Sequence, residues 1–123
     1  MRDFTFIDDV VESIYRCCKK PASINNRFDT QYPESSSSFA PYKIFNIGNS
    51  NPINLKDFID LLEKEIGIES IRELNPLQAG DVISTYSDSN KLNSWIGYKP
   101  STSLNSGVKF FIKWFINYYQ NNI

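Results

Sequence analysis

The order of helix-like and strand-like segments constrains the fold of this chain more than any other feature of the sequence. Residues 2–6, 42–47 and 68–74 are short segments typical of strands, and residues 42–47 form the clearest of them. Four other segments carry apolar residues at helical spacing. The 123 residues leave room for one domain with one modest core. The sequence therefore predicts a single α/β unit of α+β-like character that spans residues 1–123.

Capping residues and helix breakers bound the four expected helices. The expected N-terminal caps are Asp8 or Asp9, Asn54 and Asp88, and the last helix is expected to begin near Ser103. Pro21 ends the first helix, because proline cannot continue the hydrogen-bond ladder, and Gly67 follows the second helix. The first helix has one apolar face, which consists of Val10, Val11, Ile14, Tyr15 and Cys18.

A loop rich in Asn and Ser separates the first helix from the clearest strand. Residues 22–41 have no usable periodicity and include a run of serines at 35–38. Loops of about 20 residues are uncommon inside a compact domain, and they are either functional or poorly ordered. We interpret residues 22–41 as a mobile surface loop, and a functional role is the alternative.

The charge balance and the cysteines exclude several classes of partner. The chain has 13 basic and 14 acidic residues, and this near-neutral balance argues against binding to nucleic acid or to an anionic membrane surface. No apolar run approaches the roughly 20 residues that span a bilayer. The adjacent Cys17 and Cys18 are interpreted as reduced thiols, because a disulfide between neighbouring cysteines is strained. We therefore expect a cytoplasmic protein without nucleic-acid or membrane partners.

Groups that carry chemistry are scarce in this sequence. It contains no histidine, which is the commonest general base and the commonest metal ligand. A dinucleotide site needs a glycine-rich turn whose backbone amides approach the pyrophosphate. The nearest candidate, residues 48–52, has one glycine and then a proline. We predict no catalytic residue, no metal site and no cofactor-binding residue in this chain.

Tyr15 and Lys19 match the spacing of a catalytic pair in which a tyrosinate acts as the base and a lysine lowers its pKa. A spacing of four residues does place both side chains on one face of a helix. However, Tyr15 lies on the apolar face and Lys19 lies at the helix end. Two residue types at a fixed spacing also recur by chance. We interpret the match as a coincidence, with catalysis as the alternative.

Five motifs follow one another in an order that resembles a known family. They are Arg2–Glu12 (RDFTFIDDVVE), Phe45–Gly48 (FNIG), Gln78–Val82 (QAGDV), Ser87–Leu92 (SDSNKL) and Ile96–Pro100 (IGYKP). This series resembles the extended short-chain dehydrogenase/reductases that act on nucleotide sugars, and it looks most like the UDP-glucuronate 4-epimerase branch. Each motif is weak by itself, but five in order over nearly the whole chain are a specific signal.

The resemblance covers about the last third of such an enzyme and implies a division of labour. It implies that intact members bind a UDP-sugar and NAD, that the cofactor takes and returns a hydride at C4 of the sugar, and that they are homodimers. The Rossmann domain, with its NAD site and catalytic residues, has no counterpart here. The chain is thus expected to be the C-terminal substrate-binding portion. A truncated gene, a partial sequence and a split gene with a separately encoded Rossmann half remain alternatives.

The resemblance places substrate contacts at Arg2, Gln78 and Asp81. A guanidinium is always charged and bonds two oxygens at once, which suits a diphosphate. The alternative for Arg2 is a surface pair with Asp3. Gln78 stands where related galactose epimerases have an arginine, and it suits the glucuronate branch, whose substrate carries an extra carboxylate. Asp81 either accepts a hydrogen bond from a ribose hydroxyl or orders the turn after Gly80.

Three functions remain open on the sequence. The first is the substrate-binding part of an NAD-dependent nucleotide-sugar 4-epimerase, which interconverts UDP-glucuronate and UDP-galacturonate when intact and is inactive as this chain alone. The second is a non-catalytic remnant or a nucleotide-sugar-binding module. The third is part of a related dehydratase or decarboxylase, and Phe6, where the branch often has tyrosine, leaves the hexose open. Faces that would meet a Rossmann half are exposed in such a chain, so we also expect poor solubility or self-association.

Overall fold

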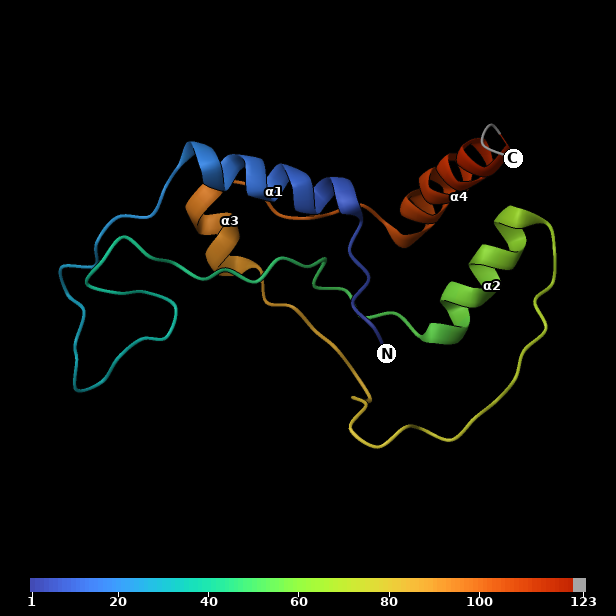
Figure 1. The fold of residues 1–123 in the computed structure, drawn as a ribbon, viewed down its shortest axis with the longest axis horizontal. Helices are drawn as coiled ribbons and strands as arrows, with labels where there is room; N and C mark the ends of the chain where they lie inside the picture. The colour runs from blue at the N-terminus through green and yellow to red at the C-terminus, as the bar shows by residue number, and fades with distance from the viewer. Residues whose placement is uncertain (121–123) are drawn as a thin grey trace.

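Helices arranged as two pairs form the regular part of the structure (Figure 1). The computed structural model describes residues 1–120. Its helices are α1 (Ile7–Lys19), α2 (Leu55–Ile66), α3 (Asn90–Ile96) and α4 (Leu104–Gln120). Helix α1 packs against α3, α2 packs against α4, and the N-terminal residues lie between the two pairs. Long irregular segments connect the helices, so turns and side-chain hydrogen bonds decide how the pairs are joined.

The ends of α2 and the start of α4 lie where the sequence predicts them. Asn54 Oδ1 accepts a hydrogen bond from the Lys56 backbone N–H at 3.0 Å, and this bond satisfies one of the free amides at the start of α2. Gly67 follows α2 with φ 80°, a left-handed conformation that glycine adopts without steric cost. At the start of α4, Ser103 Oγ accepts from the Ser106 N–H at 3.2 Å. These predicted boundaries are confirmed.

Helix α1 begins earlier than the sequence predicts. Its N-cap residue is Phe6, which has no side-chain capping bond, and Asp8 and Asp9 lie in the first helical turn. The prediction that one of these aspartates is the cap is therefore wrong. Both carboxylates still lie near the positive end of the helix dipole, where negative charge is favourable. The Asp9 carboxylate bonds to residues 98–102 instead of to its own helix.

The three predicted strands are absent from the described residues. Within residues 1–120 the extended segments form only two isolated antiparallel bridges, Arg2 with Ile53 and Ser37 with Lys43. A strand is stable only where a neighbour completes its hydrogen-bond ladder, and no long neighbour lies beside these segments. In segment 68–74 the side chains of Ile71 and Leu74 are almost fully exposed. Strand-like sequence is present here without a sheet.

The apolar face predicted for α1 points away from the helices that the structure describes. Val11, Ile14 and Tyr15 are each about half exposed, whereas the buried residues of α1 are Asp9 and Ser13. Ser13 Oγ donates to the Asp9 carbonyl at 2.7 Å, so the buried side of the helix is polar and hydrogen-bonded. The helix is amphipathic as predicted, but its polar side is the one that packs.

The apolar core is small. Leu92 of α3 is fully buried, and Val108 and Ile112 of α4 are almost fully buried. Between the N-terminal segment and α2, the rings of Phe4 and Phe58 stack with their centroids 4.3 Å apart. Each helix pair therefore has its own few buried contacts instead of sharing one large core.

The loop at residues 22–41 has internal contacts and also contacts Lys91 of α3. The Asn25 backbone N–H donates to the Ser38 carbonyl at 2.9 Å. Glu34 forms an ion pair with Lys91 of α3 at 2.6 Å, and hydrogen bonding to Lys91 lowers the pKa of Glu34 to about 2. Both side chains of this pair are more than half exposed, so the pair contributes little to stability. The predicted mobility of this loop stays a prediction.

Candidate substrate-binding site

Asp3 ties three separate segments together beside the N-terminus. Its carboxylate accepts hydrogen bonds from the backbone N–H groups of Ser50 at 3.1 Å, Asn51 at 3.3 Å and Ser87 at 2.9 Å. The Asp3 backbone N–H donates to Thr85 Oγ1 at 2.9 Å. Hydrogen bonds to an ionised carboxylate are among the stronger ones in proteins. Asp3 therefore fixes segment 85–87 and the turn at 50–51 against the N-terminal segment.

Gly48 is packed so closely that no larger residue fits. A Cβ atom at this position would lie 2.3 Å from the Ser87 Cβ and 3.2 Å from the Asp3 carboxylate. Ser89 Oγ donates to the Gly48 carbonyl at 2.8 Å and accepts from the Gly48 N–H at 3.1 Å. The turn at Gly48 is thus a packing contact between two of the five motifs.

A second carboxylate, Asp9, holds the segment that leads into α4. It accepts from the Tyr98 hydroxyl at 2.7 Å and from the backbone N–H groups of Ser101 at 3.2 Å and Thr102 at 2.9 Å. Burial opposes the charge on Asp9, but the bonds from Tyr98, Thr102 and Ser101 outweigh it and lower its pKa. Burial, together with the bond to Asp9, raises the pKa of Tyr98 to about 12. This pair is a structural clamp.

Arg2 lies at the edge of this network with its guanidinium partly exposed. Its backbone forms the bridge with Ile53, with two hydrogen bonds of 2.8 Å. Nη1 donates to the Met1 carbonyl at 3.1 Å, and Nη2 lies 3.7 Å from Asp81 Oδ1. The two side chains are 32% and 53% exposed. The alternative pair of Arg2 with Asp3 is not formed, because the Asp3 carboxylate bonds to backbone amides.

The structure brings the three predicted substrate contacts into one neighbourhood. Asp81 pairs with Arg2, and the Asp81 backbone N–H donates to the Gln78 carbonyl at 3.1 Å across a turn that contains Gly80. The Gln78 side chain is exposed. The Arg2 guanidinium and the Asp81 carboxylate thus face each other, and Gln78 lies in the same turn as Asp81. A guanidinium with free donors in a fixed fork is suited to a phosphate group.

The side chains of Tyr15 and Lys19 are arranged as a cation–π contact. Lys19 Nζ lies over the Tyr15 ring, 4.2 Å from its centroid. A lysine that lowers a tyrosine pKa must lie near the phenolic oxygen, whereas this one lies over the ring face. The pair also lies in the C-terminal half of α1, toward the end of the helix that is farther from the N-terminal segment (Figure 1).

Asp88 accepts a hydrogen bond from the first turn of its own helix, as the sequence predicts. Its Oδ1 accepts from the Asn90 backbone N–H at 2.9 Å at the start of α3. The N-cap residue itself is Ser89, one position later than predicted, and its side chain bonds to the Gly48 carbonyl instead of capping the helix. A ligand role for Asp88 has no support from this geometry.

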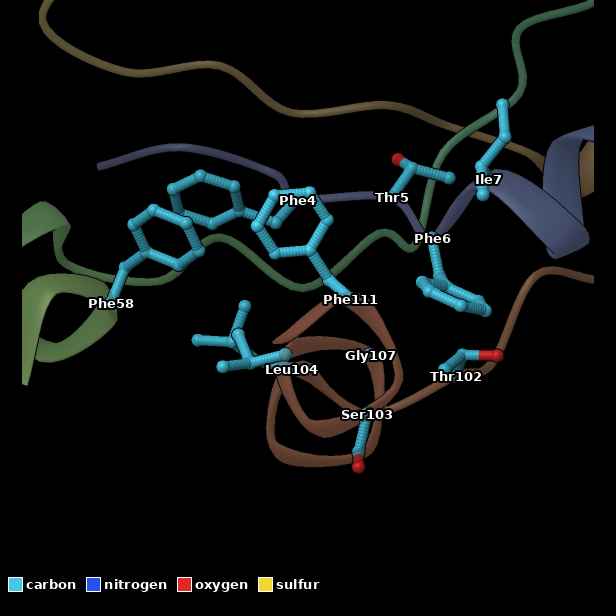
Figure 2. Close-up of a pocket in the computed structure, with 11 residues that line it drawn as sticks. Phe4, Thr5, Phe6, Ile7, Phe58, Thr102, Ser103, Leu104, Gly107 and Phe111 are labelled. Carbon is cyan, nitrogen blue, oxygen red and sulfur yellow. The ribbon is translucent and has the colours of Figure 1, made fainter. Parts of the chain in front are cut away.

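An apolar groove lies between the N-terminal segment and the first turns of α4 (Figure 2). Its volume is about 300 Å³. Its walls are mainly aromatic and aliphatic, with Phe4, Phe6, Phe58, Leu104 and Phe111 among the lining residues. The alternation of Phe4 and Phe6 is the signal in the sequence that marks one wall. Because its walls lack charged groups, the groove is suited to apolar contacts and not to a phosphate.

Neither a metal cluster nor a membrane-spanning helix is present within residues 1–120. No cluster of three or more His, Cys, Asp or Glu side chains in this range is arranged to hold a metal ion. No helix in the described range is long and apolar enough to cross a membrane. The free thiols of Cys17 and Cys18 lie on α1, and burial raises the pKa of Cys17. A raised pKa leaves a thiol less nucleophilic at neutral pH.

Comparison with curated proteins gives relatives over nearly the whole chain. No family model matches. The chain is 43% identical over 120 residues to protein CapI of Staphylococcus aureus. The aligned region covers 98% of this chain and 36% of CapI. It is 38% identical over 120 residues to a probable UDP-glucuronate 4-epimerase of Rhizobium meliloti. That aligned region covers 97% of this chain and 35% of the relative. The chain therefore spans about a third of the length of these relatives.

A solved structure has the same arrangement of segments. It is the crystal structure of UDP-glucose 4-epimerase from Bifidobacterium longum in complex with NAD+ and UDP, with a TM-score of 0.71 and 17% sequence identity. The match covers 98% of this chain and 31% of that chain. At this identity the match shows the fold alone. The expected fold, that of one portion of such an epimerase, is confirmed, although the described residues form helices and two isolated bridges instead of a sheet. The identities to the curated relatives confirm the resemblance seen in the motifs.

Proposed function

We propose that this chain is the substrate-binding part of an NAD-dependent nucleotide-sugar 4-epimerase. It matches about one third of the length of a probable UDP-glucuronate 4-epimerase. The observation that carries the proposal is its 38% identity to a probable UDP-glucuronate 4-epimerase across 97% of the chain. In the complete enzyme we expect interconversion of UDP-glucuronate and UDP-galacturonate. We expect this chain by itself to catalyse no epimerisation, since the described residues present no arranged acid–base pair.

The proposed role of Arg2 is to bind the diphosphate of the substrate. Its side chain is 32% exposed, and the backbone bridge to Ile53 fixes the point of the chain from which that side chain extends. A partly exposed guanidinium can donate two parallel hydrogen bonds to phosphate oxygens. Gln78 belongs to the turn that carries Asp81, and its side chain is a neutral amide donor, which suits contact with an uncharged part of the ligand.

The NAD that the family uses does not fit the residues described here. The nearest candidate for a glycine-rich turn is at Gly48, where the N–H already donates to Ser89 Oγ and the Ser87 side chain packs closely. The amides of Ser50 and Asn51 donate to Asp3. A pyrophosphate needs free amides at such a turn. We therefore assign NAD binding and the hydride transfer to the two thirds of the relatives that this chain does not match.

Isothermal titration calorimetry with UDP and with UDP-glucuronate tests the proposal. We expect saturable binding to the unaltered chain and a loss of affinity of roughly tenfold or more in Arg2→Ala, because hydrogen bonds to charged groups are among the strongest. Arg27→Ala is the matched control, since Arg27 is an exposed arginine in the loop at 22–41. An equal loss of affinity in both variants, or no heat with either ligand, would contradict the proposal.

A nucleotide-sugar-binding module without turnover is the second candidate. It is favoured by one observation: Arg2, Gln78 and Asp81 form an exposed polar edge, whereas the only tyrosine–lysine match is a cation–π contact on α1. The two candidates differ when the missing portion is supplied as a separate polypeptide from a relative. A binding module then still gives no UDP-galacturonate, whereas a substrate-binding part restores the reaction. Measurement of UDP-galacturonate formation by chromatography distinguishes the two candidate functions.

A further inference from the structure

The N-terminal segment, residues 1–3, lies between two other segments and is hydrogen-bonded to both. On one side, the Arg2 backbone exchanges two hydrogen bonds of 2.8 Å with Ile53. On the other side, the Thr85 backbone N–H donates to the Met1 carbonyl at 3.3 Å. The backbone of Arg2 is thus bonded directly to the first side, and its neighbours in the chain tie it to the second side.

Asp3 bonds to both sides at once. Its Oδ2 accepts from the Ser87 backbone N–H at 2.9 Å and from the Ser50 N–H at 3.1 Å, and its Oδ1 accepts from the Asn51 N–H at 3.3 Å. The Asp3 backbone N–H also donates to Thr85 Oγ1 at 2.9 Å. Because hydrogen bonds to an ionised carboxylate are strong, these contacts hold the three segments in one register.

The backbone of Ser50 shows how firmly this junction is held. Ser50 has φ 56°, and it is the only residue other than glycine with a positive φ within residues 1–120. Its Oγ donates to the Ser87 carbonyl at 2.8 Å, and its N–H donates to Asp3. A residue with a side chain keeps this unfavourable conformation where the surrounding contacts impose it. The contacts around Asp3 therefore determine the backbone of the turn at 50–51.

The register at this junction sets the distance between two proposed substrate contacts. Arg2 directly precedes Asp3 in the sequence, and the turn at 78–81 lies just before Thr85. A slip of one residue moves an extended segment by about 3.3 Å along its neighbour. Donor–acceptor distances in hydrogen bonds vary by only about 0.5 Å. A ligand that contacts Arg2 and the turn at 78–81 together therefore needs the register that Asp3 imposes.

We propose that Asp3 is a positioning residue, which holds Arg2 and the turn at 78–81 at the spacing that one nucleotide-sugar molecule spans. This inference rests on the proposed function, because it assumes that both Arg2 and this turn contact the substrate. Asp3 acts through its bonds to backbone amides and not by touching the ligand. It follows that Asp3 affects ligands that reach both contacts and has little effect on ligands that reach one of them.

Titrations of the full chain with three ligands test the inference. UDP is long enough to reach both contacts, whereas inorganic pyrophosphate reaches Arg2 alone and uridine reaches the turn alone. Asp3→Asn keeps the shape of the side chain and removes its charge and one acceptor oxygen. We expect it to weaken UDP binding about two- to tenfold and to change the affinities for pyrophosphate and uridine by less than about twofold. Calorimetry measures the binding of UDP, and NMR titration measures that of the two smaller ligands.

Three further variants control for a general loss of structure. Asp9→Asn removes the other carboxylate that accepts from several backbone amides, at residues 101 and 102, and should leave UDP binding unchanged. In the Arg2→Ala background, Asp3→Asn should cost little more affinity, because the spacing no longer matters when one contact is gone. Thr85→Val removes the acceptor of the Asp3 N–H, and it should give a smaller loss that is also specific to UDP. Circular dichroism checks the fold of each variant, and Thr85→Val replaces Asp3→Asn in the comparison where the latter does not fold.

The outcomes separate this inference from the proposed function. Unchanged UDP binding in Asp3→Asn, with the loss in Arg2→Ala intact, overturns the positioning role and leaves the proposed function standing. An equal loss for all three ligands, or an equal loss of UDP affinity in Asp9→Asn, means a general loss of structure and overturns the inference. A loss in Asp3→Asn that adds fully to that of Arg2→Ala shows that the two residues act independently and also overturns it. No binding of UDP to the unaltered chain overturns both.

Discussion

Gly48 and Asp3 have structural roles that account for their place in the motifs. The Asp3 carboxylate collects three backbone N–H groups, and Gly48 packs its α-carbon against Ser87. Neither residue is then available for a ligand. By contrast, Arg2 makes a single side-chain hydrogen bond, to the Met1 carbonyl, and a long ion pair to Asp81. Arg2 and Asp3 are thus adjacent in one motif but have different roles. Asp3 fixes the fold, and Arg2 presents a positive charge.

Replacement of Gly48 by alanine tests this close packing. The added Cβ would lie 2.3 Å from the Ser87 Cβ, so Gly48→Ala must displace a backbone segment, and we expect a loss of about 1–3 kcal/mol in the free energy of unfolding. The matched control is Gly107→Ala, whose Cβ meets only the Phe6 side chain at 3.2 Å and which gains helix propensity. Urea unfolding followed by circular dichroism gives both values. Equal stabilities of the two variants would contradict the packing at Gly48.

At the scale of elements, the helices were predictable and the strands were not. The apolar spacing of α2 and α4, together with Asn54 and Gly67, acts within a few residues of each helix, so the sequence carries that information locally. A strand depends on a partner that is distant in sequence. Segment 42–47 has strand-like residues, but within the described residues its backbone pairs with Ser36 and Ser37 through one hydrogen bond and one isolated bridge. Local pattern therefore could not decide whether a sheet would form.

The Asp9 clamp joins α1 to the start of α4, and its strength depends on pH. Because the folded protein lowers the pKa of Asp9, its stabilising effect is complete above the ordinary aspartate pKa and is lost as the pH falls through the lowered value. We expect Asp9→Asn to lower the free energy of unfolding by about 2 kcal/mol at pH 6. The difference should shrink as the pH falls from 4 toward 2.

The control for this prediction is Asp8→Asn. Asp8 lies in the same first turn of α1 but is exposed, so it shares the helix dipole without the clamp. Denaturant titrations across the pH range give the two profiles. A difference between the unaltered chain and Asp9→Asn that does not change with pH would show that the Asp9 charge is not what the clamp uses.

At the scale of the whole molecule, the exposed apolar surface is large for the small core. The outer face of α1 carries Ile7, Val11, Ile14 and Tyr15, each about half exposed or more, and α4 exposes several aromatic side chains. Soluble monomers rarely leave such faces uncovered. The relatives are about three times as long as this chain, so their remaining residues are available to cover these faces.

We expect the chain to self-associate through these apolar faces when it is expressed alone. Val11→Lys places a charge on the exposed face of α1 and should lower the mean mass measured by sedimentation velocity. Asn105→Lys adds the same charge at an exposed polar position of α4 and should leave it unchanged. A monodisperse monomer of the unaltered chain, with a cooperative melt, would contradict this prediction.

The site could be predicted only in part from the sequence, because some of its contacts depend on the fold of the whole chain. Arg2, Gln78 and Asp81 were proposed from motifs, and the structure brings them together although Asp81 is far from Arg2 in sequence. Asp9 was predicted to be a helix cap, and its bonds to residues 98–102 were missed because they join segments some 90 residues apart. Contacts across such separations depend on the fold and leave no local pattern.

The affinity of the chain for UDP relative to uridine tests the central claim most directly. The two ligands differ only in the diphosphate, so their ratio isolates the group that Arg2 is proposed to bind. The account predicts that UDP binds much more tightly than uridine to the unaltered chain and that this advantage falls by roughly tenfold or more in Arg2→Ala. A ratio that is the same in both proteins would contradict it.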